Sequence, residues 1–244
     1  MIDVSKLDKQ TLAGTMDFSI LPKNTRKSDI LKGCELTRKY RFAAFYSSSA
    51  YWSPLVAAEL AGAGVEIGTG IAFPFGSAPS AVKAFEVEDA VRRGCTTVDL
   101  VINVGALKDK EYDVVRGELK DFVRAAGGAV TKAILEVCFL NDEDIAAACK
   151  LVAETGVRFA KTSTGQFEGP DMRQFLLMKK TLAGTGVKLK VAGIKFPRPQ
   201  NAILFLLAGA DRLGTRAAPE IVDALDQMKE IGLVRWPERT SSWP

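Results

Sequence analysis

The sequence of 244 residues contains no histidine, and this absence removes several kinds of chemistry. Ser-His-Asp and Cys-His nucleophile systems need an imidazole, as do metal sites built on that group. The four cysteines, Cys34, Cys95, Cys138 and Cys149, are far apart and form no C-x-x-C pair. They are therefore interpreted as reduced core or helix residues, and zinc catalysis is not expected. Acid–base work falls to Lys, Asp, Glu, Tyr, Cys or water.

Membrane and nucleic-acid signals are also absent. No apolar stretch approaches membrane-spanning length, and the first residues, Met1 to Lys6, lack the pattern of a signal peptide. The net charge of +4 comes from 33 basic and 29 acidic residues that are well interspersed, with no basic stripe between aromatics. We therefore expect a cytoplasmic protein without a membrane or nucleic-acid partner, whose mild positive bias suits an anionic small molecule.

The length and the composition fit one domain with a large core. The chain is 47% hydrophobic and 25% charged, which is typical of a soluble fold, although the length alone would also permit two domains. We expect residues 1–244 to form a single domain, with an irregular tail over residues 235–244.

Short apolar runs alternate with helical patterns along the whole chain. Ser28 and Asn141 are expected to cap helices, and Gly156 to end one. The predicted strands cover residues 14–19, 42–46, 65–73, 97–103, 131–137, 157–160, 187–193 and 211–215. The predicted helices cover residues 28–40, 54–63, 80–93, 112–126, 141–154, 170–183, 199–208 and 219–231.

Eight strand–helix units at a step of roughly 30 residues predict an α/β fold, the parallel eight-stranded (β/α)₈ TIM barrel. The alternative is a doubly wound open sheet. Such a sheet usually has a glycine-rich dinucleotide-binding motif after its first strand. Here Gly62-Ala-Gly64 precedes a predicted strand, and we interpret these glycines as the end of a helix.

Charged residues interrupt the apolar strands near their carboxyl ends, where the active site of such a barrel lies. Lysines on the fifth, sixth and seventh strands accompany an aspartate on the fourth, an arrangement that is difficult to explain as solvated surface. The alternative is an ion network that only closes the barrel mouth. The converging residues are Asp17, Asp99, Lys132, Glu136, Lys161 and Lys190.

Lys161 stands out among them because it ends a short buried strand and is followed by Thr-Ser-Thr-Gly. Alone, it could be a lysine whose stem packs on the strand while its ammonium reaches solvent. Beside other lysines its pKa would fall, and a free amine can attack a carbonyl to form an iminium that serves as an electron sink. An aspartate within reach, working through water, would move the protons. The pattern therefore favours Schiff-base catalysis.

The loop after Lys161 carries groups suited to binding. Thr162 and Thr164 can donate hydrogen bonds to a polyol substrate or hold the loop in place. Gly165 leaves backbone N–H groups free for an anion.

Five motifs together resemble deoxyribose-phosphate aldolase, over about residues 16–223. They are Phe73-Pro-Phe-Gly76, Val82-Lys-Ala-Phe-Glu86, Val98-Asp-Leu-Val-Ile-Asn-Val-Gly-Ala-Leu107, Phe159-Ala-Lys-Thr-Ser-Thr-Gly165 and Lys190-Val-Ala-Gly193. The resemblance implies a (β/α)₈ class I aldolase that joins acetaldehyde to glyceraldehyde 3-phosphate without a metal or another cofactor, and that forms a homo-oligomer, a dimer or higher.

By that resemblance Lys161 is the Schiff-base lysine, Lys190 the lysine that perturbs its pKa and Asp99 the proton-relay acid. Lys132 and Asp17 match positions of the family's supporting polar network. The expected substrate-binding residues are Ser19, where the family usually has a threonine, and Thr162, Gly165, Gly193 and Arg216.

The phosphate-binding end departs from the family pattern. The second glycine of the usual Gly-Gly pair is Ile194, followed by Lys195 and Arg198 within Lys-Phe-Pro-Arg. After the eighth strand, where the family usually has serines at the start of a phosphate-binding helix turn, residues 214–219 are Gly-Thr-Arg-Ala-Ala-Pro. Tyr46 occupies the position of a cysteine that is familiar after the second strand in the family. The C-terminal tyrosine of some members has no match in this sequence.

Arg216 has two interpretations. It could form a bidentate clamp on a phosphate or a carboxylate, or it could point outward to an acid on a neighbouring helix.

The first hypothesis is therefore a class I aldolase that cleaves 2-deoxy-D-ribose 5-phosphate reversibly to acetaldehyde and D-glyceraldehyde 3-phosphate. A second keeps the lysine chemistry but changes the substrate to another hydroxy-aldehyde, ketose or carboxylate. A third, from a different class, is a barrel that binds a sugar phosphate without catalysis.

Overall fold

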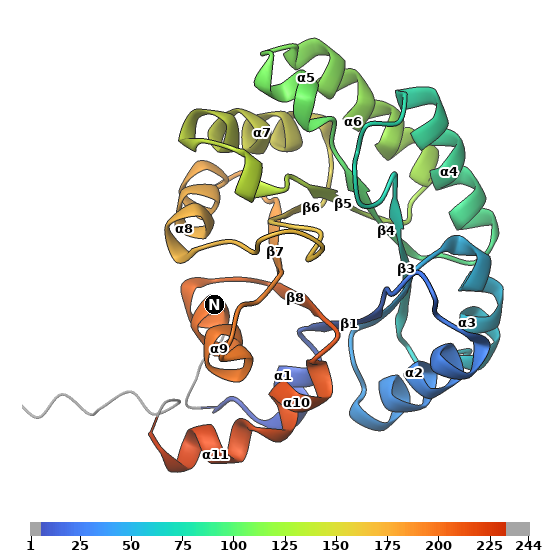
Figure 1. Cartoon of the computed structure of the whole chain (residues 1–244), viewed down its shortest axis with the longest axis vertical. Coiled ribbons are helices and arrows are strands. Elements are labelled where there is room, and N and C mark those ends of the chain that lie inside the picture. Colours follow the sequence, from blue (N-terminus) through green and yellow to red (C-terminus); the bar gives the residue numbers. More distant parts are fainter. Residues whose placement is uncertain (1–5, 233–244) are drawn as a thin grey trace, which may run out of the picture.

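Eight parallel strands form the centre of the molecule, and each pairs with the next in chain order until the last closes onto the first (Figure 1). The computed structural model describes residues 6–232. The strands are β1 (Met16–Ile20), β2 (Ala44–Ser47), β3 (Glu66–Ile71), β4 (Thr97–Val101), β5 (Val130–Ile134), β6 (Phe159–Lys161), β7 (Lys188–Ala192) and β8 (Arg212–Thr215). The predicted (β/α)₈ barrel is confirmed, and the open doubly wound sheet is excluded because β8 pairs with β1.

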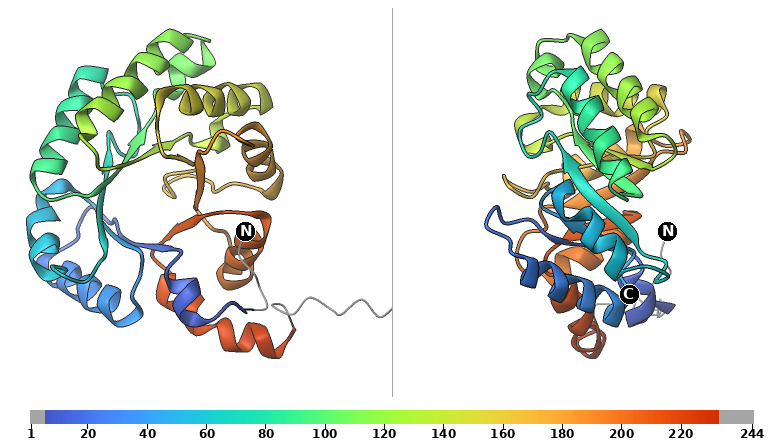
Figure 2. Two further views of the ribbon diagram at one scale, coloured as in Figure 1. Left: turned by 180° about the vertical axis from the view of Figure 1, so that it is seen from behind. Right: turned by 90° about the vertical axis from the view of Figure 1, so that its right-hand side faces the viewer.

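Helices surround the strands, as the views from behind and from the side also show (Figure 2). The first and last parts of the ring meet, since α1 packs against α10. The helices are α1 (Lys9–Ala13), α2 (Lys27–Tyr40), η2 (Ala50–Trp52), α3 (Ser53–Glu59), α4 (Ser80–Arg92), α5 (Val104–Lys108), α6 (Tyr112–Ala126), η3 (Val137–Phe139), α7 (Asp142–Thr155), α8 (Met172–Thr181), α9 (Arg198–Ala208), α10 (Ala218–Asp223) and α11 (Leu225–Glu230).

Most predicted element ends are confirmed to within a few residues, and two details are wrong. Asn141 caps α7 and Gly156 ends it in the left-handed conformation, as expected. Ser28, however, lies inside the first turn of α2, because the Asp29 carboxylate accepts the N–H of Arg26 at 2.8 Å and starts the helix earlier. The single helix expected over residues 219–231 is divided into α10 and α11 at Ala224. The tail predicted over residues 235–244 lies outside the described residues.

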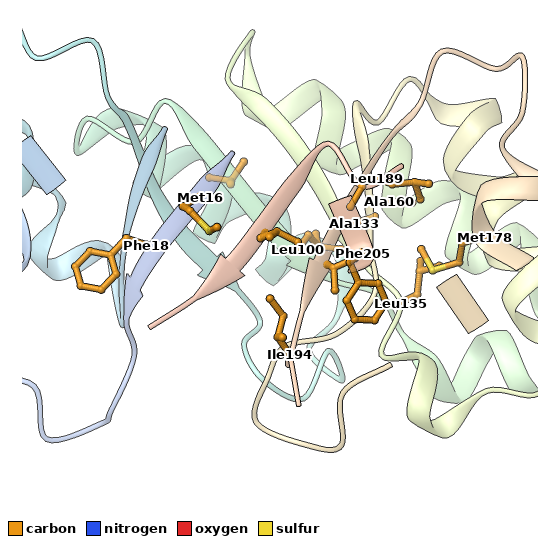
Figure 3. Packing of buried hydrophobic residues seen from close by; sticks show 14 of the residues in the cluster. Met16, Phe18, Leu100, Ala133, Leu135, Ala160, Met178, Leu189, Ile194 and Phe205 are labelled. Carbon is orange, nitrogen blue, oxygen red and sulfur yellow. The ribbon is translucent and has the colours of Figure 1, made fainter. Parts of the chain in front are cut away.

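The main core lies between the strands and the helices (Figure 3). Ala133 and Ala160 point outward from β5 and β6 and are fully buried. Their neighbours in sequence, Lys132 and Lys161, therefore point into the barrel, because successive residues of a strand face opposite sides. The alternation of side chains along each strand therefore places the apolar residues under the helices and the polar residues inside the barrel.

The four cysteines form no disulfide; Cys34, Cys95 and Cys149 are buried and Cys138 is half-buried. Among residues 6–232, no helix has the length and apolar character that crossing a bilayer requires.

Candidate active site

Three lysines and two aspartates meet inside the barrel. Asp17 comes from β1, Asp99 from β4, and Lys132, Lys161 and Lys190 from β5, β6 and β7. Lys161 is opposite Lys190 in the register of β6 and β7, and Asp99 is opposite Lys132 in that of β4 and β5. Lys161 is 6% exposed and the others at most 1%, so their charges interact with little screening by water. Five of the six residues expected to converge are in this cluster; Glu136 follows β5 and instead accepts the N–H of Thr164.

The five side chains form a chain of alternating charge. Lys161 Nζ donates to Asp99 Oδ2 at 2.8 Å, and Lys190 Nζ lies 2.7 Å from the same oxygen. Lys190 Nζ is also 2.7 Å from Asp17 Oδ2, and Lys132 Nζ donates to that oxygen at 2.7 Å. Each carboxylate is therefore shared by two ammonium groups.

Lys161 gives up its proton more readily than Lys190, because their pKa values are shifted in opposite directions. Burial lowers its pKa to about 8; Lys190 and Lys132 contribute to the decrease, and Asp99 opposes it. For Lys190 burial also favours the neutral amine, but Asp17 and Asp99 outweigh it and raise the pKa. Three lysines face two aspartates, so deprotonation of Lys161 leaves equal numbers of positive and negative charges.

Both aspartates are held as carboxylates. Burial by itself would raise the pKa of Asp99, but the ammonium groups of Lys161, Lys190 and Lys132 hold it well below its usual range. Lys132, Lys190 and Arg212 do the same for Asp17. A carboxylate that stays ionised beside an amine can accept a hydrogen bond and exchange protons through water.

The network continues to the amino-terminal end of the barrel through two residues that the sequence analysis did not select. Arg212 donates to Asp17 Oδ1 at 3.2 Å and to Glu66 Oε1 at 3.1 Å. Both are partly exposed, and both begin a strand. The signal that could have identified them is the same period of two, which aligns Arg212 with Lys190 across β7 and β8.

Tyr46 on β2 is the most important residue that sequence reasoning left without a role. Its hydroxyl donates to Asp99 Oδ1 at 2.7 Å, and its ring centroid is 4.0 Å from Lys190 Nζ. Alternation along β2 predicts that Tyr46 faces inward, but its contact with Asp99 depends on the packing across the barrel.

A small cavity of about 30 Å³ lies beside Lys161. Asp17, Asp99 and Lys190 line it together with Tyr46 and Phe73. A second, open compartment of about 420 Å³ contains Gly165, Gly193, Arg198 and Arg216. Ser19, Leu21, Thr164 and Gly214 line both, so the cavity of Lys161 and the compartment of the two arginines adjoin. A larger hollow of about 750 Å³, lined by residues of the loop after β1 and of α2, contains none of the three lysines.

Backbone contacts shape the second compartment. Gly165 and Gly193 have φ values of 80° and 76°, a conformation that favours glycine. A Cβ on Gly169 would be 1.7 Å from the carbonyl oxygen of Gly193, so the loops after β6 and β7 meet backbone to backbone. Ile194, which stands in place of a further glycine, is buried and lines the compartment.

The predicted threonines hold the loop. Thr162 Oγ1 accepts the N–H of Ala192 at 3.1 Å and is 3.3 Å from the carbonyl oxygen of the same residue, and Thr162 lines neither cavity. The N–H of Thr164 donates to Glu136 Oε1 at 3.0 Å, and its hydroxyl accepts the N–H of Gln166 at 3.1 Å. Of the two roles considered for Thr162, its contacts match the structural one.

Arg216 is exposed, lines the second compartment and makes no ion pair with any residue in the range 6–232. The outward pair with an acid on a neighbouring helix is therefore absent from the described part of the chain. Arg198 stacks on Phe196 and is 4.0 Å from Glu220, while Lys195 pairs with Glu168 at 2.7 Å. Over the same residues, no cluster of three or more Cys, Asp or Glu could hold a metal ion.

No protein-family model matches the chain. Deoxyribose-phosphate aldolase of Bacillus subtilis (strain 168) is 39% identical over 213 residues, which cover 87% of this chain and 95% of the relative. A solved structure named "QR15, an Aldolase" is 30% identical with a TM-score of 0.83, over 95% of this chain and 99% of that one. A tetrameric deoxyribose phosphate aldolase from Aeropyrum pernix has the same fold, with a TM-score of 0.83 and 24% identity over 93% of this chain and 98% of that one. The chain, a lyase that acts on carbon–carbon bonds, therefore belongs to the deoxyribose-phosphate aldolase family.

Proposed function

We propose that the chain is a class I aldolase that cleaves 2-deoxy-D-ribose 5-phosphate reversibly to acetaldehyde and D-glyceraldehyde 3-phosphate. The observation that carries this proposal is a buried lysine with a pKa of about 8, 2.8 Å from the carboxylate of Asp99, in a cavity that adjoins a compartment with two arginines. The relative from Bacillus subtilis bears the name of this activity.

In the proposed mechanism the neutral amine of Lys161 attacks the aldehyde carbon of the substrate, and loss of water gives an iminium. The C3 hydroxyl then loses its proton as the C2–C3 bond breaks. The electron pair of that bond moves into the iminium, which becomes an enamine, and glyceraldehyde 3-phosphate leaves. Protonation of the enamine and addition of water release acetaldehyde and restore the amine.

The neighbours of Lys161 have separate roles in this proposal. Asp99 moves the protons through water, since it stays ionised and touches Lys161. Lys190 remains an ammonium that lowers the pKa of Lys161. Lys132 and Asp17 support this charge network from β5 and β1.

The second compartment would take the phosphate end. Arg198 and Arg216 line it beside Gly165 and Gly193, and Ser19 lies between it and the cavity of Lys161. Arginine suits phosphate because its planar fork donates two parallel hydrogen bonds. A carboxylate could use the same fork, so a different substrate with an anionic end is the second candidate.

Turnover tests the proposal directly. The unaltered protein should release acetaldehyde and glyceraldehyde 3-phosphate from 2-deoxyribose 5-phosphate, measured in a coupled assay. Lys161→Met should reduce kcat by about 1,000-fold or more, because it removes the amine that forms the covalent intermediate in the proposed mechanism. Lys188→Met, which removes an exposed lysine two residues before Lys190 on β7, should leave kcat within about twofold. Full activity of Lys161→Met would contradict the proposal.

Substrate choice separates the two candidates. Arg216→Met should raise the KM for 2-deoxyribose 5-phosphate by about 10-fold or more and leave turnover of unphosphorylated 2-deoxyribose unchanged, since a hydrogen bond to a charged group contributes about 1.5–3 kcal/mol. Arg173→Met, at an exposed arginine paired with Asp142 on the helical ring, is the matched control. An equal effect on both sugars would argue against a phosphate clamp.

We also propose a cytoplasmic homo-oligomer, a dimer or higher, that acts in carbohydrate catabolism. The four free cysteines suit a reducing compartment, and the Aeropyrum pernix structure is tetrameric. Cell fractionation and light scattering during gel filtration would test the location and the assembly; a monomer at working concentration would contradict the second.

A further inference from the structure

Tyr46 contacts the charged cluster directly, and the proposed mechanism gives it no role. It lies on β2 and is buried, and its hydroxyl donates to Asp99 Oδ1 at 2.7 Å. The same hydroxyl oxygen is 3.1 Å from Thr97 Oγ1. Burial, Asp99 and Asp17 raise the pKa of Tyr46 well above its usual value, so the phenol keeps the proton that it donates.

The two oxygens of Asp99 therefore have different partners. Oδ2 receives Lys161 and Lys190, at 2.8 and 2.7 Å, while Oδ1 receives Tyr46. A carboxylate held at both oxygens cannot rotate about its Cβ–Cγ bond without losing a hydrogen bond, and a buried oxygen left without a donor is destabilising. The phenol thus holds Asp99 with one oxygen toward the two lysines.

The Tyr46 ring has a second effect. It lines the cavity of about 30 Å³ beside Lys161, with Phe73 as another aromatic wall. The cavity is small, so these two rings restrict the space beside the Lys161 amine. The ring centroid is also 4.0 Å from Lys190 Nζ, a favourable cation–π distance.

This ring position requires Gly68. Tyr46 and Gly68 are opposite each other in the register of β2 and β3. A Cβ on residue 68 would be 2.4 Å from the ring, so an alanine would force the ring away. Gly68 does not have a positive φ; the conflict is therefore purely steric.

We propose that Tyr46 is a positioning and specificity-determining residue: its hydroxyl fixes the Asp99 carboxylate for the two lysines, and its ring, admitted by Gly68, limits the size of the carbonyl donor that reacts with Lys161. The inference rests on the aldol activity proposed above.

Two variants separate the hydroxyl from the ring. Tyr46→Phe keeps the ring and should reduce kcat by about 10-fold or more, with little change in KM and an unchanged preference for acetaldehyde over acetone as the donor. Tyr46→Ala enlarges the cavity and should raise the rate ratio of acetone to acetaldehyde by about 10-fold or more. Tyr46→Leu takes its place if the alanine variant does not fold.

A double-mutant cycle tests the dependence on Gly68. Gly68→Ala should reduce kcat by about 10-fold in the presence of Tyr46 and by less than about twofold in the Tyr46→Ala background, because the clash is then gone. A general loss of stability would affect both backgrounds equally, and thermal unfolding of all four proteins checks this.

The results also separate this inference from the proposed function. Absence of any aldol product with the unaltered protein would refute the function. If that protein is active, a kcat for Tyr46→Phe within about twofold would overturn the role of the hydroxyl, and an unchanged donor ratio in Tyr46→Ala would overturn that of the ring.

Discussion

The reactivity proposed for Lys161 is a property of its neighbours more than of the lysine itself. An ordinary lysine has a pKa of about 10.4, and burial with Lys190 and Lys132 nearby brings that of Lys161 to about 8. The proposed nucleophile is the neutral amine, so kcat/KM should rise with pH up to about 8 and then level off.

Removal of Lys190 should move that rise to higher pH. Lys190→Met takes away a like charge that lowers the pKa of Lys161 and leaves Asp99 without its second ammonium. Both changes favour protonated Lys161, so the acid limb of the kcat/KM profile should shift upward by about one pH unit or more. The profile of Lys188→Met should match that of the unaltered enzyme. A limb that stays in place, or moves to lower pH, would contradict the charge argument.

The sequence predicted most of the charged residues of the site, because each one interrupts an apolar strand. In a parallel barrel the carboxyl ends of all strands lie at the same end, so these residues were expected to be close together. It did not predict the contacts of Tyr46, since these depend on the packing of β2 against β3 and β4. The structural use of the Thr162 hydroxyl also depends on a neighbouring strand, through its contacts with Ala192.

At the scale of elements, a buried ion pair between two helices holds the end of the strand that carries Asp99. Lys83 on α4 donates to Glu118 on α6 at 2.6 Å and to the carbonyl of Val101 at 2.8 Å. Glu118 in turn accepts the N–H of Asn103 at 3.0 Å. The two helices thus fix the backbone just beyond β4.

Breaking this pair should be strongly destabilising. Lys83→Met leaves the buried Glu118 without its cation, and such a change costs about 3–5 kcal/mol of unfolding free energy, measurable by urea unfolding. Glu168→Gln breaks the exposed pair with Lys195 and should cost less than about 1 kcal/mol. Similar values for the two variants would show that the helices do not depend on the buried pair.

Element boundaries were less predictable than element types. The third strand was expected to reach Phe73, but it ends at Ile71 because Ala72 has a φ of 49°, outside the strand region. Helix α2 starts before its expected cap for a similar reason: Asp29 closes the first turn on the backbone of Arg26. The N–H of Ala72 donates to the Glu86 carboxylate and that of Arg26 to the Asp29 carboxylate, and the period of the apolar residues does not encode such contacts.

At the scale of the whole molecule, closure of the barrel brings together charges from β1, β4, β5, β6, β7 and β8. The free energy of unfolding should therefore depend on pH in the acidic range. Asp17 and Asp99 have pKa values held well below the usual range. Their contribution to stability is complete above the unfolded-state pKa, about 3.9, and is lost as the pH falls below it.

Because Asp17 and Asp99 stay ionised between pH 7 and about pH 5, they should not change the urea midpoint of unfolding in that range. The midpoint should fall steeply below about pH 4. Unfolding curves followed by circular dichroism at several pH values provide the measurement. A midpoint at pH 3 equal to that at pH 7 would mean that the two buried carboxylates are not stabilised by their lysines.

The central claim is that Lys161 forms the covalent intermediate, and reductive trapping tests it most directly. Incubation with acetaldehyde and borohydride, followed by peptide mass spectrometry, should find an added ethyl group on Lys161, together with loss of activity. Lys161→Arg should show no such adduct. An unmodified Lys161 under conditions of good turnover, or an adduct on Lys190 in its place, would contradict the account.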